Sequence, residues 1–168
     1  LYISSTTYTT TAALQPKLPF DPVSDLTGVT MLGRGPMVLV VHPSVPAKTV
    51  KELIAVARAK PGQLNYTSSG IGGINHLGVE VLRSMAKIDV LNIPYKGAGQ
   101  ALNDTVAGHV QFQVNTLLAA LPFIQAGRLR AIGVCGAKRA AALPNVATVA
   151  ETIKGFESSG WYALMGPA

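Results

Sequence analysis

The sequence has little cysteine and no long hydrophobic run. Among its 168 residues Cys135 is the only cysteine, which excludes an intrachain disulfide and a C-x-x-C metal or redox pair. This cysteine lies in the apolar stretch "LRAIGVCG", which predicts a buried, unreactive thiol. No stretch approaches the ~18 consecutive apolar residues of a transmembrane helix. The sequence therefore predicts no membrane-spanning segment.

Acidic residues are also scarce, with 8 Asp and Glu against 14 Lys and Arg and a net charge of +6. Such a surplus can attract a small acidic molecule, a nucleic acid or an anionic membrane. The basic residues are scattered, apart from a loose group formed by Arg128, Arg130, Lys138 and Arg139. No aromatic residues alternate with them to stack on bases. The pattern favours a solvated surface and no nucleic-acid partner.

Hydrophobic residues make up 48% of the chain and charged residues 13%, which supports a folded core. Helix-like segments with one apolar stripe alternate with short β-branched segments bounded by Gly or Pro. This alternation predicts an α/β fold with a largely parallel sheet. Strands are expected at residues 1–4, 28–35, 36–43, 63–68, 88–95, 109–114, 129–136 and 160–167, and helices at 49–60, 73–86, 100–107, 116–127 and 148–153.

Two local signals refine this pattern. Thr49 and Glu52 have the spacing of a capping box, so a helix is expected to begin at Thr49 and to stop before Pro61. The hydroxyl-rich stretch 4–12, "SSTTYTTTA", is expected to be a loop.

The chain begins at Leu1 inside an apparent strand and ends soon after another, which favours a piece of a longer protein.

The stretch "YTSSGIGGINHL", residues 66–77, predicts a strand end, a glycine-rich turn and a helix start. Backbone N–H groups at a helix start are unpaired and the helix dipole makes that end electropositive. Glycines allow a ligand to approach the backbone, and the hydroxyls of Ser68 and Ser69 add donors. The combination suits a carboxylate or phosphate. The alternative is that either serine only caps the helix and the glycines only make a tight turn.

More specific motifs are absent from the sequence. It has no G-x-x-x-x-G-K-[ST] loop, and Asn75 replaces the third glycine of a dinucleotide fingerprint, so no cofactor is expected. No G-x-S-x-G elbow surrounds Ser68 or Ser69, so a Ser/His catalytic pair with His76 is weakly supported. The three histidines have no i, i+4 spacing and the acids are dispersed, so no metal site and no catalytic residue is expected. His76 lies opposite the apolar stripe of its helix, facing either solvent or a cleft.

Several segments together resemble the receptors of tripartite tricarboxylate transporters, also called the Bug family. The resemblance rests on "NYTSSGIGGINHL", "IPYKGAGQALNDTVAGHVQFQV", "LPFIQAGRLRAIGV" and "KRAAALPNVATVAE", which occur in the family's order and spacing. It implies a type II periplasmic binding protein with two lobes, the Venus-flytrap fold, present here as a chain incomplete at both ends. The implied division is residues 1–42 in lobe one, 43–134 in lobe two and 135–168 crossing back into lobe one.

The resemblance also implies a binding site. Its residues would be Ser4, Ser5, Thr6 and Thr7 of lobe one, and Ser68, Ser69, Gly70, Ile71, Gly72, Gly73, His76 and Asn115 of lobe two. Val114 stands where the family often has Asp, so recognition of a ligand amine is not expected there. Tyr95 and Lys96 match the family's "PYKG" signature, where helix entry and lobe packing are the expected roles.

The resemblance implies a receptor rather than an enzyme. Its ligand would be a small carboxylate, such as a di- or tricarboxylate, an amino acid or an aromatic acid. Its partners would be the membrane subunits of the transporter, and its location the periplasm, with the signal peptide not present in this chain. Two alternatives are a Ser/His hydrolase on an α/β scaffold and an anion-dependent regulatory or nucleic-acid-binding module.

Overall fold

The computed structural model describes residues 1–15 and 17–168 of the chain. Strands and helices alternate through most of it. The strands are β1 (Tyr2–Ser5), β2 (Leu26–Val41), β3 (Asn65–Ser68), β4 (Leu91–Pro94), β5 (Phe112–Thr116), β6 (Arg130–Val134) and β7 (Ser159–Pro167). The helices are α1 (Thr6–Leu14), α2 (Val50–Ala59), α3 (Ile74–Ala86), α4 (Ala98–Ala107) and α5 (Leu117–Gln125), with a short 3₁₀ helix, η1, at Val149–Glu151.

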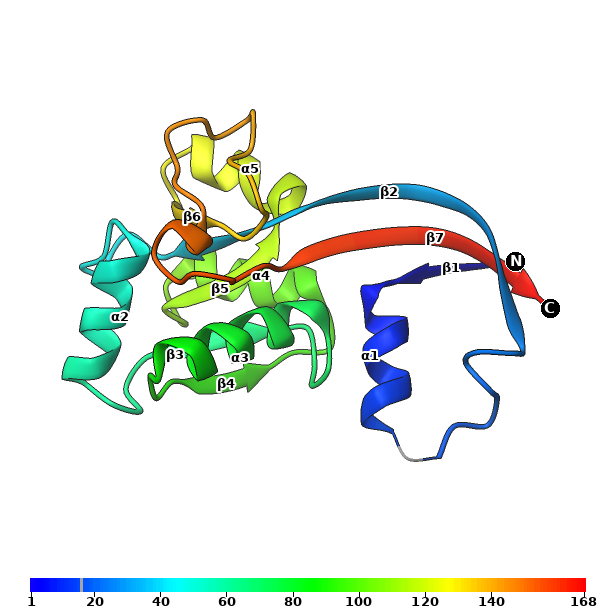
Figure 1. Ribbon diagram of the computed structural model, residues 1–168. Helices are drawn as coiled ribbons and strands as arrows, with labels where there is room; N and C mark the ends of the chain where they lie inside the picture. The colour runs from blue at the N-terminus through cyan, green and yellow to red at the C-terminus, as the bar shows by residue number, and fades with distance from the viewer. Residues whose placement is uncertain (16) are drawn as a thin grey trace.

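Strand β2 joins two parts of the molecule (Figure 1). Its outer half pairs antiparallel with β7, from Leu26↔Pro167 to Pro36↔Ser159. Its inner half, Met37–Val41, enters a second sheet and lies between β5 and β6. The long β2–β7 ribbon thus connects a helix-rich body to the end where β1, α1 and both termini lie.

The sheet is mixed rather than largely parallel, so that prediction was wrong. Strand β3 pairs parallel with β4 and at one position with β5. The pairings of β2 with β5, β6 and β7 and of β1 with β7 are all antiparallel. Residues 28–35 and 36–43, expected as two strands, belong to the one strand β2, which ends at Val41.

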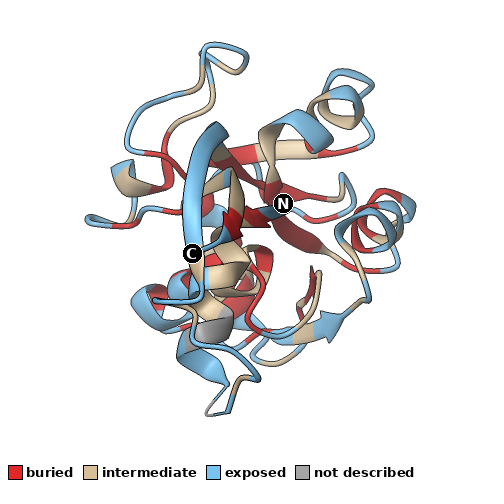
Figure 2. Ribbon diagram, turned by 90° about the vertical axis from the view of Figure 1, so that its right-hand side faces the viewer, coloured by how far each residue is buried: buried red, intermediate tan, exposed pale blue. Residues whose placement is uncertain are grey.

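Inner β2 is buried on both faces, which explains its unbroken apolar run "MVLVV". Met37, Leu39 and Val41 belong to a core cluster that includes residues of α2 and α3. Val38 and Val40 face the other way, into a smaller cluster with residues of α4 and α5. Figure 2 shows the buried residues gathered in the helix-rich body. In the long ribbon, outer β2 is mostly exposed and β7 is mostly half-buried.

The hydroxyl-rich stretch 4–12 is not a loop, contrary to expectation. Strand β1 ends at Ser5 and α1 begins at once at Thr6. Threonine has a modest helix propensity, but here its hydroxyls bond within the helix, from Thr9 Oγ1 to the Thr6 carbonyl at 2.8 Å. The Thr6 hydroxyl also accepts the Trp161 N–H at 3.0 Å, which fixes the helix start to β7. Tertiary contact therefore outweighs intrinsic preference.

The predicted helix starts are close to those observed. Thr49 caps α2 by accepting the Glu52 N–H at 3.2 Å, while the Glu52 carboxylate accepts from the Lys48 N–H rather than from that of Thr49. A complete capping box occurs instead at Thr148 and Glu151, at the start of η1. The assignment of residues 1–42, 43–134 and 135–168 to lobes stays a prediction, since β2 contributes to both parts of the molecule.

Candidate functional site

The glycine-rich turn lies between the end of β3 at Ser68 and the start of α3 at Ile74. Gly70 and Gly72 adopt φ values of 119° and 82°. Residues with a side chain rarely adopt this conformation, so both positions favour glycine. The predicted strand, turn and helix start are confirmed at these residues.

Only part of the turn's hydrogen-bonding capacity is used by the protein itself. The Gly73 N–H donates to the Gly70 carbonyl at 3.2 Å. The Gly72 N–H donates to Nδ1 of His76 at 3.4 Å. Within residues 1–15 and 17–168, no acceptor is found for the backbone N–H groups of Gly70, Ile71, Ile74, Asn75 and His76. These N–H groups and the helix dipole make the turn electropositive.

The two serines of the turn differ in their contacts. The Ser69 hydroxyl lies 3.1 Å from Oδ1 of Asn75, and Nδ2 of Asn75 donates to the Val114 carbonyl at 2.7 Å. The Ser68 hydroxyl is buried, and the described residues offer it no partner. Sequence reasoning noted Asn75 only as the replacement for a glycine and missed this bridge. The available signal was an amide side chain directly inside a helix start.

His76 is half-buried beneath the turn rather than free in solvent. Its ring centre lies 6.3 Å from that of Tyr66, and the Tyr66 hydroxyl donates to Glu80 at 2.8 Å. Burial and this bond to Glu80 raise the pKa of Tyr66. Burial opposes ionisation of Glu80, but hydrogen bonds from Arg83 and Tyr66 outweigh it and lower the Glu80 pKa.

The predicted residues of lobe one lie where β1 meets α1. Ser4 is buried and, in the described part of the chain, its hydroxyl has no partner. Ser5 pairs with Tyr162, Thr6 accepts from Trp161, and the Thr7 carbonyl accepts the Thr10 hydroxyl at 2.9 Å.

Helix α1 reaches the glycine turn directly. The Thr10 hydroxyl also lies 2.6 Å from the Gly72 carbonyl. A Cβ built on Gly72 would lie 2.7 Å from Cδ1 of Leu14. Neither Thr10 nor Leu14 was expected at the site. The contact places the start of α3 beside α1.

Asn115 lies at the carboxyl end of β5 and is buried. Its Nδ2 donates to Oε1 of Gln113 at 3.0 Å, and its Oδ1 accepts the Thr116 N–H at 2.7 Å. Protein groups therefore hold its side chain. Val114, between the two amides, packs in the core against α3, where a Cβ on Gly78 would lie 3.0 Å from its Cγ1.

Tyr95 joins β4 to the turn through its backbone, because its N–H donates to the Ser68 carbonyl at 2.9 Å. Its hydroxyl donates to Asp104 of α4, which raises the pKa of Tyr95 to about 12. Lys96 is exposed. These contacts agree with the expected packing role of Tyr95.

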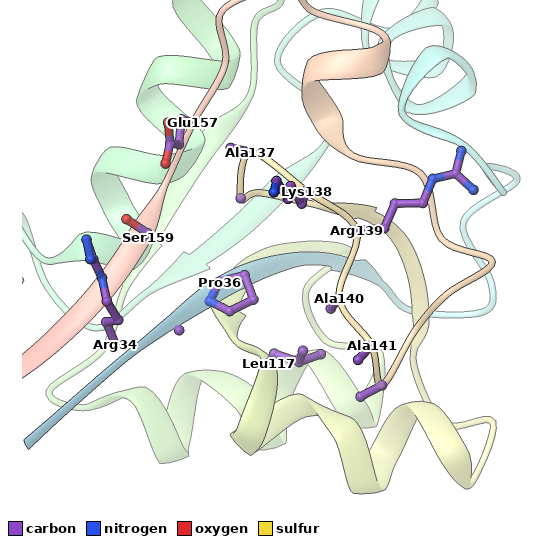
Figure 3. Close-up of a pocket in the computed structure, with 13 residues that line it drawn as sticks. Arg34, Pro36, Leu117, Ala137, Lys138, Arg139, Ala140, Ala141, Glu157 and Ser159 are labelled. Atoms are coloured by element: carbon purple, nitrogen blue, oxygen red, sulfur yellow. The ribbon is translucent and has the colours of Figure 1, made fainter.

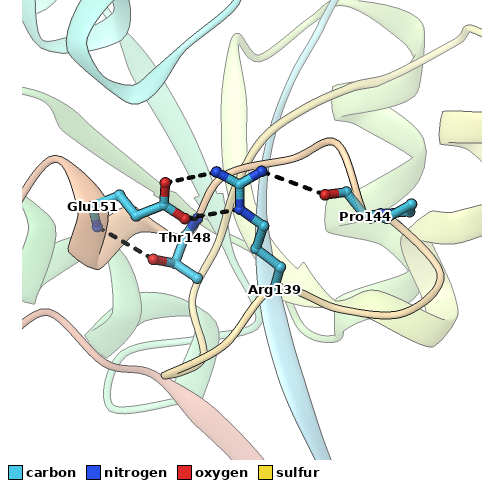
Figure 4. A network of polar contacts seen from close by, with 4 residues as sticks. All are labelled: Arg139, Pro144, Thr148 and Glu151. Atoms are coloured by element: carbon cyan, nitrogen blue, oxygen red, sulfur yellow. Dashed lines mark hydrogen bonds and ion pairs between the residues drawn. The ribbon is translucent and has the colours of Figure 1, made fainter.

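A second candidate is a cavity of about 500 Å³ beside the β2–β7 ribbon (Figure 3). Arg34 and Lys138 contribute positive charge to it and Glu157 negative charge. Arg139 also lines it, but its guanidinium turns away and forms a double contact with Glu151, at 2.9 and 2.7 Å (Figure 4). An adjoining, more apolar cavity of about 740 Å³ is lined by α5 and Tyr162. Residues 68–73 line neither cavity.

Residues 1–15 and 17–168 offer neither a membrane span nor a metal cluster. None of their helices is long and apolar enough to cross a membrane, and these residues contain no group of three or more His, Cys, Asp or Glu side chains placed to hold a metal ion. Cys135 is buried as predicted, and burial raises the pKa of its thiol.

The chain is similar to several known proteins along nearly all of its length. BugT of Bordetella pertussis is 33% identical over 156 residues, which are 92% of this chain and 48% of BugT. A solved structure of R. palustris Rpa4515 with adipate superposes with a TM-score of 0.93 at 32% identity, over 98% of this chain and 56% of that one. The periplasmic binding protein BugD superposes with a TM-score of 0.93 at 25% identity, over the same shares of the two chains.

The chain spans about half the length of the relatives that it matches. The family model described as "Tripartite tricarboxylate transporter family receptor" matches all of residues 1–168. The predicted resemblance and the periplasmic-binding-protein fold are therefore confirmed, and the chain belongs to the tripartite tricarboxylate transporter receptor family.

Proposed function

We propose that the protein is an extracytoplasmic receptor that binds a small carboxylate at the glycine-rich turn and delivers it to a tripartite transporter. The observation that carries the proposal is the set of unpaired N–H groups between Gly70 and His76. Such groups bind carboxylate oxygens well because the helix dipole adds to their hydrogen bonds. The similar structure of Rpa4515 with adipate supports a carboxylate as the class of ligand.

The position of α1 suggests how a second contact arises. The helix begins at Thr6, close behind the hydroxyls of Ser4 and Ser5, and Thr10 one turn later contacts the turn. The start of α1 lies one helical turn before Thr10, and a helix start can hold a carboxylate group. We therefore place dicarboxylates first among the candidate ligands, with both ends of the ligand held by backbone N–H groups.

The proposal includes no catalysis. The Ser69 hydroxyl contacts Asn75, and within residues 1–15 and 17–168 no serine hydroxyl contacts His76. A receptor needs only differential affinity for its closed form. We infer a periplasmic location and a partnership with the transporter's membrane subunits from membership of the family.

Ligand binding can be tested by thermal unfolding with acetate, adipate, malate and citrate. A ligand that binds only the folded state raises the melting temperature, by an amount equivalent to about 2.7 kcal/mol at 100 times its dissociation constant. Adipamide, which has the length of adipate without its charge, is the control. A folded protein whose melting temperature responds to none of these acids would contradict the proposal.

The site can be mapped with Ile71, which is 79% exposed in the middle of the turn. Ile71→Asp places a negative charge beside the free N–H groups and should weaken adipate binding by at least about tenfold, or 1.4 kcal/mol. Ile71→Asn introduces a side chain of the same shape as Asp but without the charge, so this variant should bind adipate nearly as the wild type does. If Arg34→Ala weakens binding and Ile71→Asp does not, the ligand occupies the cavity beside the ribbon instead.

A further inference from the structure

Asn75 occupies an unusual place for a residue in the first turn of a helix. It is the second residue of α3, yet only 6% of it is exposed. Its side chain points inward, toward the carboxyl end of β5, instead of toward solvent. Both ends of its amide contact groups outside α3, Ser69 in the turn and Val114 in β5.

The orientation of this amide follows from the chemistry of its partners. The Val114 carbonyl can only accept a hydrogen bond, so the group that lies 2.7 Å from it must be Nδ2. Oδ1 then faces Ser69, and an amide oxygen can only accept. The Ser69 hydroxyl therefore donates its single hydrogen to Asn75 and has none left for a ligand. The free donors of the turn are thus its backbone N–H groups.

The sheet explains why Asn75 is needed at this point. Strands β3 and β5 pair only at Tyr66↔Phe112. The register of the two strands includes no pair beyond this one, and the Val114 carbonyl accepts a hydrogen bond from the Asn75 amide. About one turn after Asn75, helix α3 packs closely on β5: a Cβ built on Gly78 would lie 3.0 Å from Cγ1 of Val114. The glycine turn, which has little intrinsic rigidity, is therefore tied to β5 by Asn75.

We propose that Asn75 is a positioning residue that holds the glycine-rich turn in the conformation that presents its N–H groups to the carboxylate. This inference rests on the proposed function of the turn. Asn75 does not contact the ligand. It acts through Ser69 on one side and β5 on the other.

The first test measures the turn in the ligand-free protein by ¹⁵N relaxation. Asn75→Ala should lower the backbone order parameters of Gly70 and Gly72 from about 0.85, typical of rigid backbone, to below about 0.6. Asn103→Ala, at an exposed position of α4, is the matched control and should leave them unchanged. Unchanged order parameters in a folded Asn75→Ala protein would overturn the inference, whether or not a ligand is known.

The second test measures adipate affinity by calorimetry, well below the melting temperature. Asn75→Ala should weaken binding by about tenfold. This is the change in affinity expected when the loss of preorganisation is as large as the net contribution of one hydrogen bond. Asn75→Asp keeps the acceptor for Ser69 but loses the donor to Val114, so it should not restore affinity. Wild-type affinity in Asn75→Ala would overturn the inference, whereas absence of adipate binding in the wild type would count against the proposed function alone.

Ser69→Ala is the second variant, should Asn75→Ala not fold. It removes only the hydroxyl that donates to Asn75, so it should loosen the turn in the same direction and by less. In the double variant the effect on affinity should equal that of Asn75→Ala, because Ser69 acts through Asn75. Fully additive effects of the two substitutions would show independent roles and overturn the link.

Discussion

The two halves of β2 differ in both composition and environment: residues 37–41 are all apolar, whereas residues 26–36 mix apolar residues with Gly, Thr, Arg and Pro. Inner residues Met37–Val41 are completely buried, whereas Met31 and Leu32 of the outer half are more than half exposed. Inner β2 lies between two strands and is covered by helices on both faces. The outer half pairs with β7 and has little covering it (Figure 2). Burial along this strand therefore follows its local composition and what packs on it, since Met31 and Leu32 stay exposed although they are apolar.

Truncating a side chain to alanine should have the most different effects on the stability of the two halves of β2. Leu39→Ala removes a fully buried side chain of the main core and should lower the free energy of unfolding by about 2–5 kcal/mol. Met31→Ala, where the side chain is 58% exposed, should change it by no more than about 0.5 kcal/mol. Urea unfolding of both variants measures the contrast. A large cost for Met31→Ala would show that the outer half is covered in solution.

Two glycines provide the opposite experiment, in which volume is added. A Cβ on Gly133 of β6 would lie 2.8 Å from both Val149 and Val50, so Gly133→Ala should destabilise the protein by about 1–3 kcal/mol. A Cβ on Gly35 of outer β2 meets nothing within 4 Å. Gly35→Ala should therefore be neutral or slightly stabilising. If both substitutions were equally harmful, packing density would not distinguish the core around inner β2, where Gly133 pairs with Leu39, from the outer half.

The sequence predicted the fold best where a pattern is local. Helix α3 and the capped start of α2 follow from apolar spacing and capping residues, and both were correct. The antiparallel pairing of β2 with β7 joins segments more than 120 residues apart, and no local pattern encodes such a partner. The same holds for α1, whose threonine-rich sequence argues against a helix until its contact with β7 is known.

The candidate site follows the same rule. Glycine spacing located the turn and its helix start, because both depend on neighbouring residues. Thr10 and Asn75 were missed because their partners, Gly72 and Val114, lie 62 and 39 residues away. The sequence also could not show that Ser69 gives its hydrogen to Asn75, which depends on how α3 is seated on β5.

Thr10 tests the direct contact between the two parts of the molecule. Thr10→Val removes the hydroxyl that bonds the Gly72 carbonyl and should lower the free energy of unfolding by about 1 kcal/mol. Thr9→Val is the matched control, because Thr9 bonds only the Thr6 carbonyl within the same helix. Thermal unfolding of the pair isolates the contribution of the inter-part bond. Equal losses in the two variants would assign the effect to the helix and not to the contact with the turn.

The smallest expected effect belongs to the exposed ion pair of Arg139 and Glu151 (Figure 4). Hydrogen bonds from Arg139 and from the Thr148 backbone lower the pKa of Glu151 to about 2. A carboxylate whose pKa is lower in the folded than in the unfolded state stabilises the protein above its unfolded pKa, and this contribution disappears as the pH falls toward the folded value. Glu151→Gln should therefore be slightly less stable than the wild type near neutral pH, and the difference should shrink to nothing between about pH 4.5 and pH 2. Because the pair is exposed, high salt should also reduce the difference. If the stability difference between Glu151→Gln and the wild type persisted unchanged down to pH 2, the charge of Glu151 would not be what stabilises this loop. The capping contact of Glu151 with Thr148 would then be the stabilising interaction.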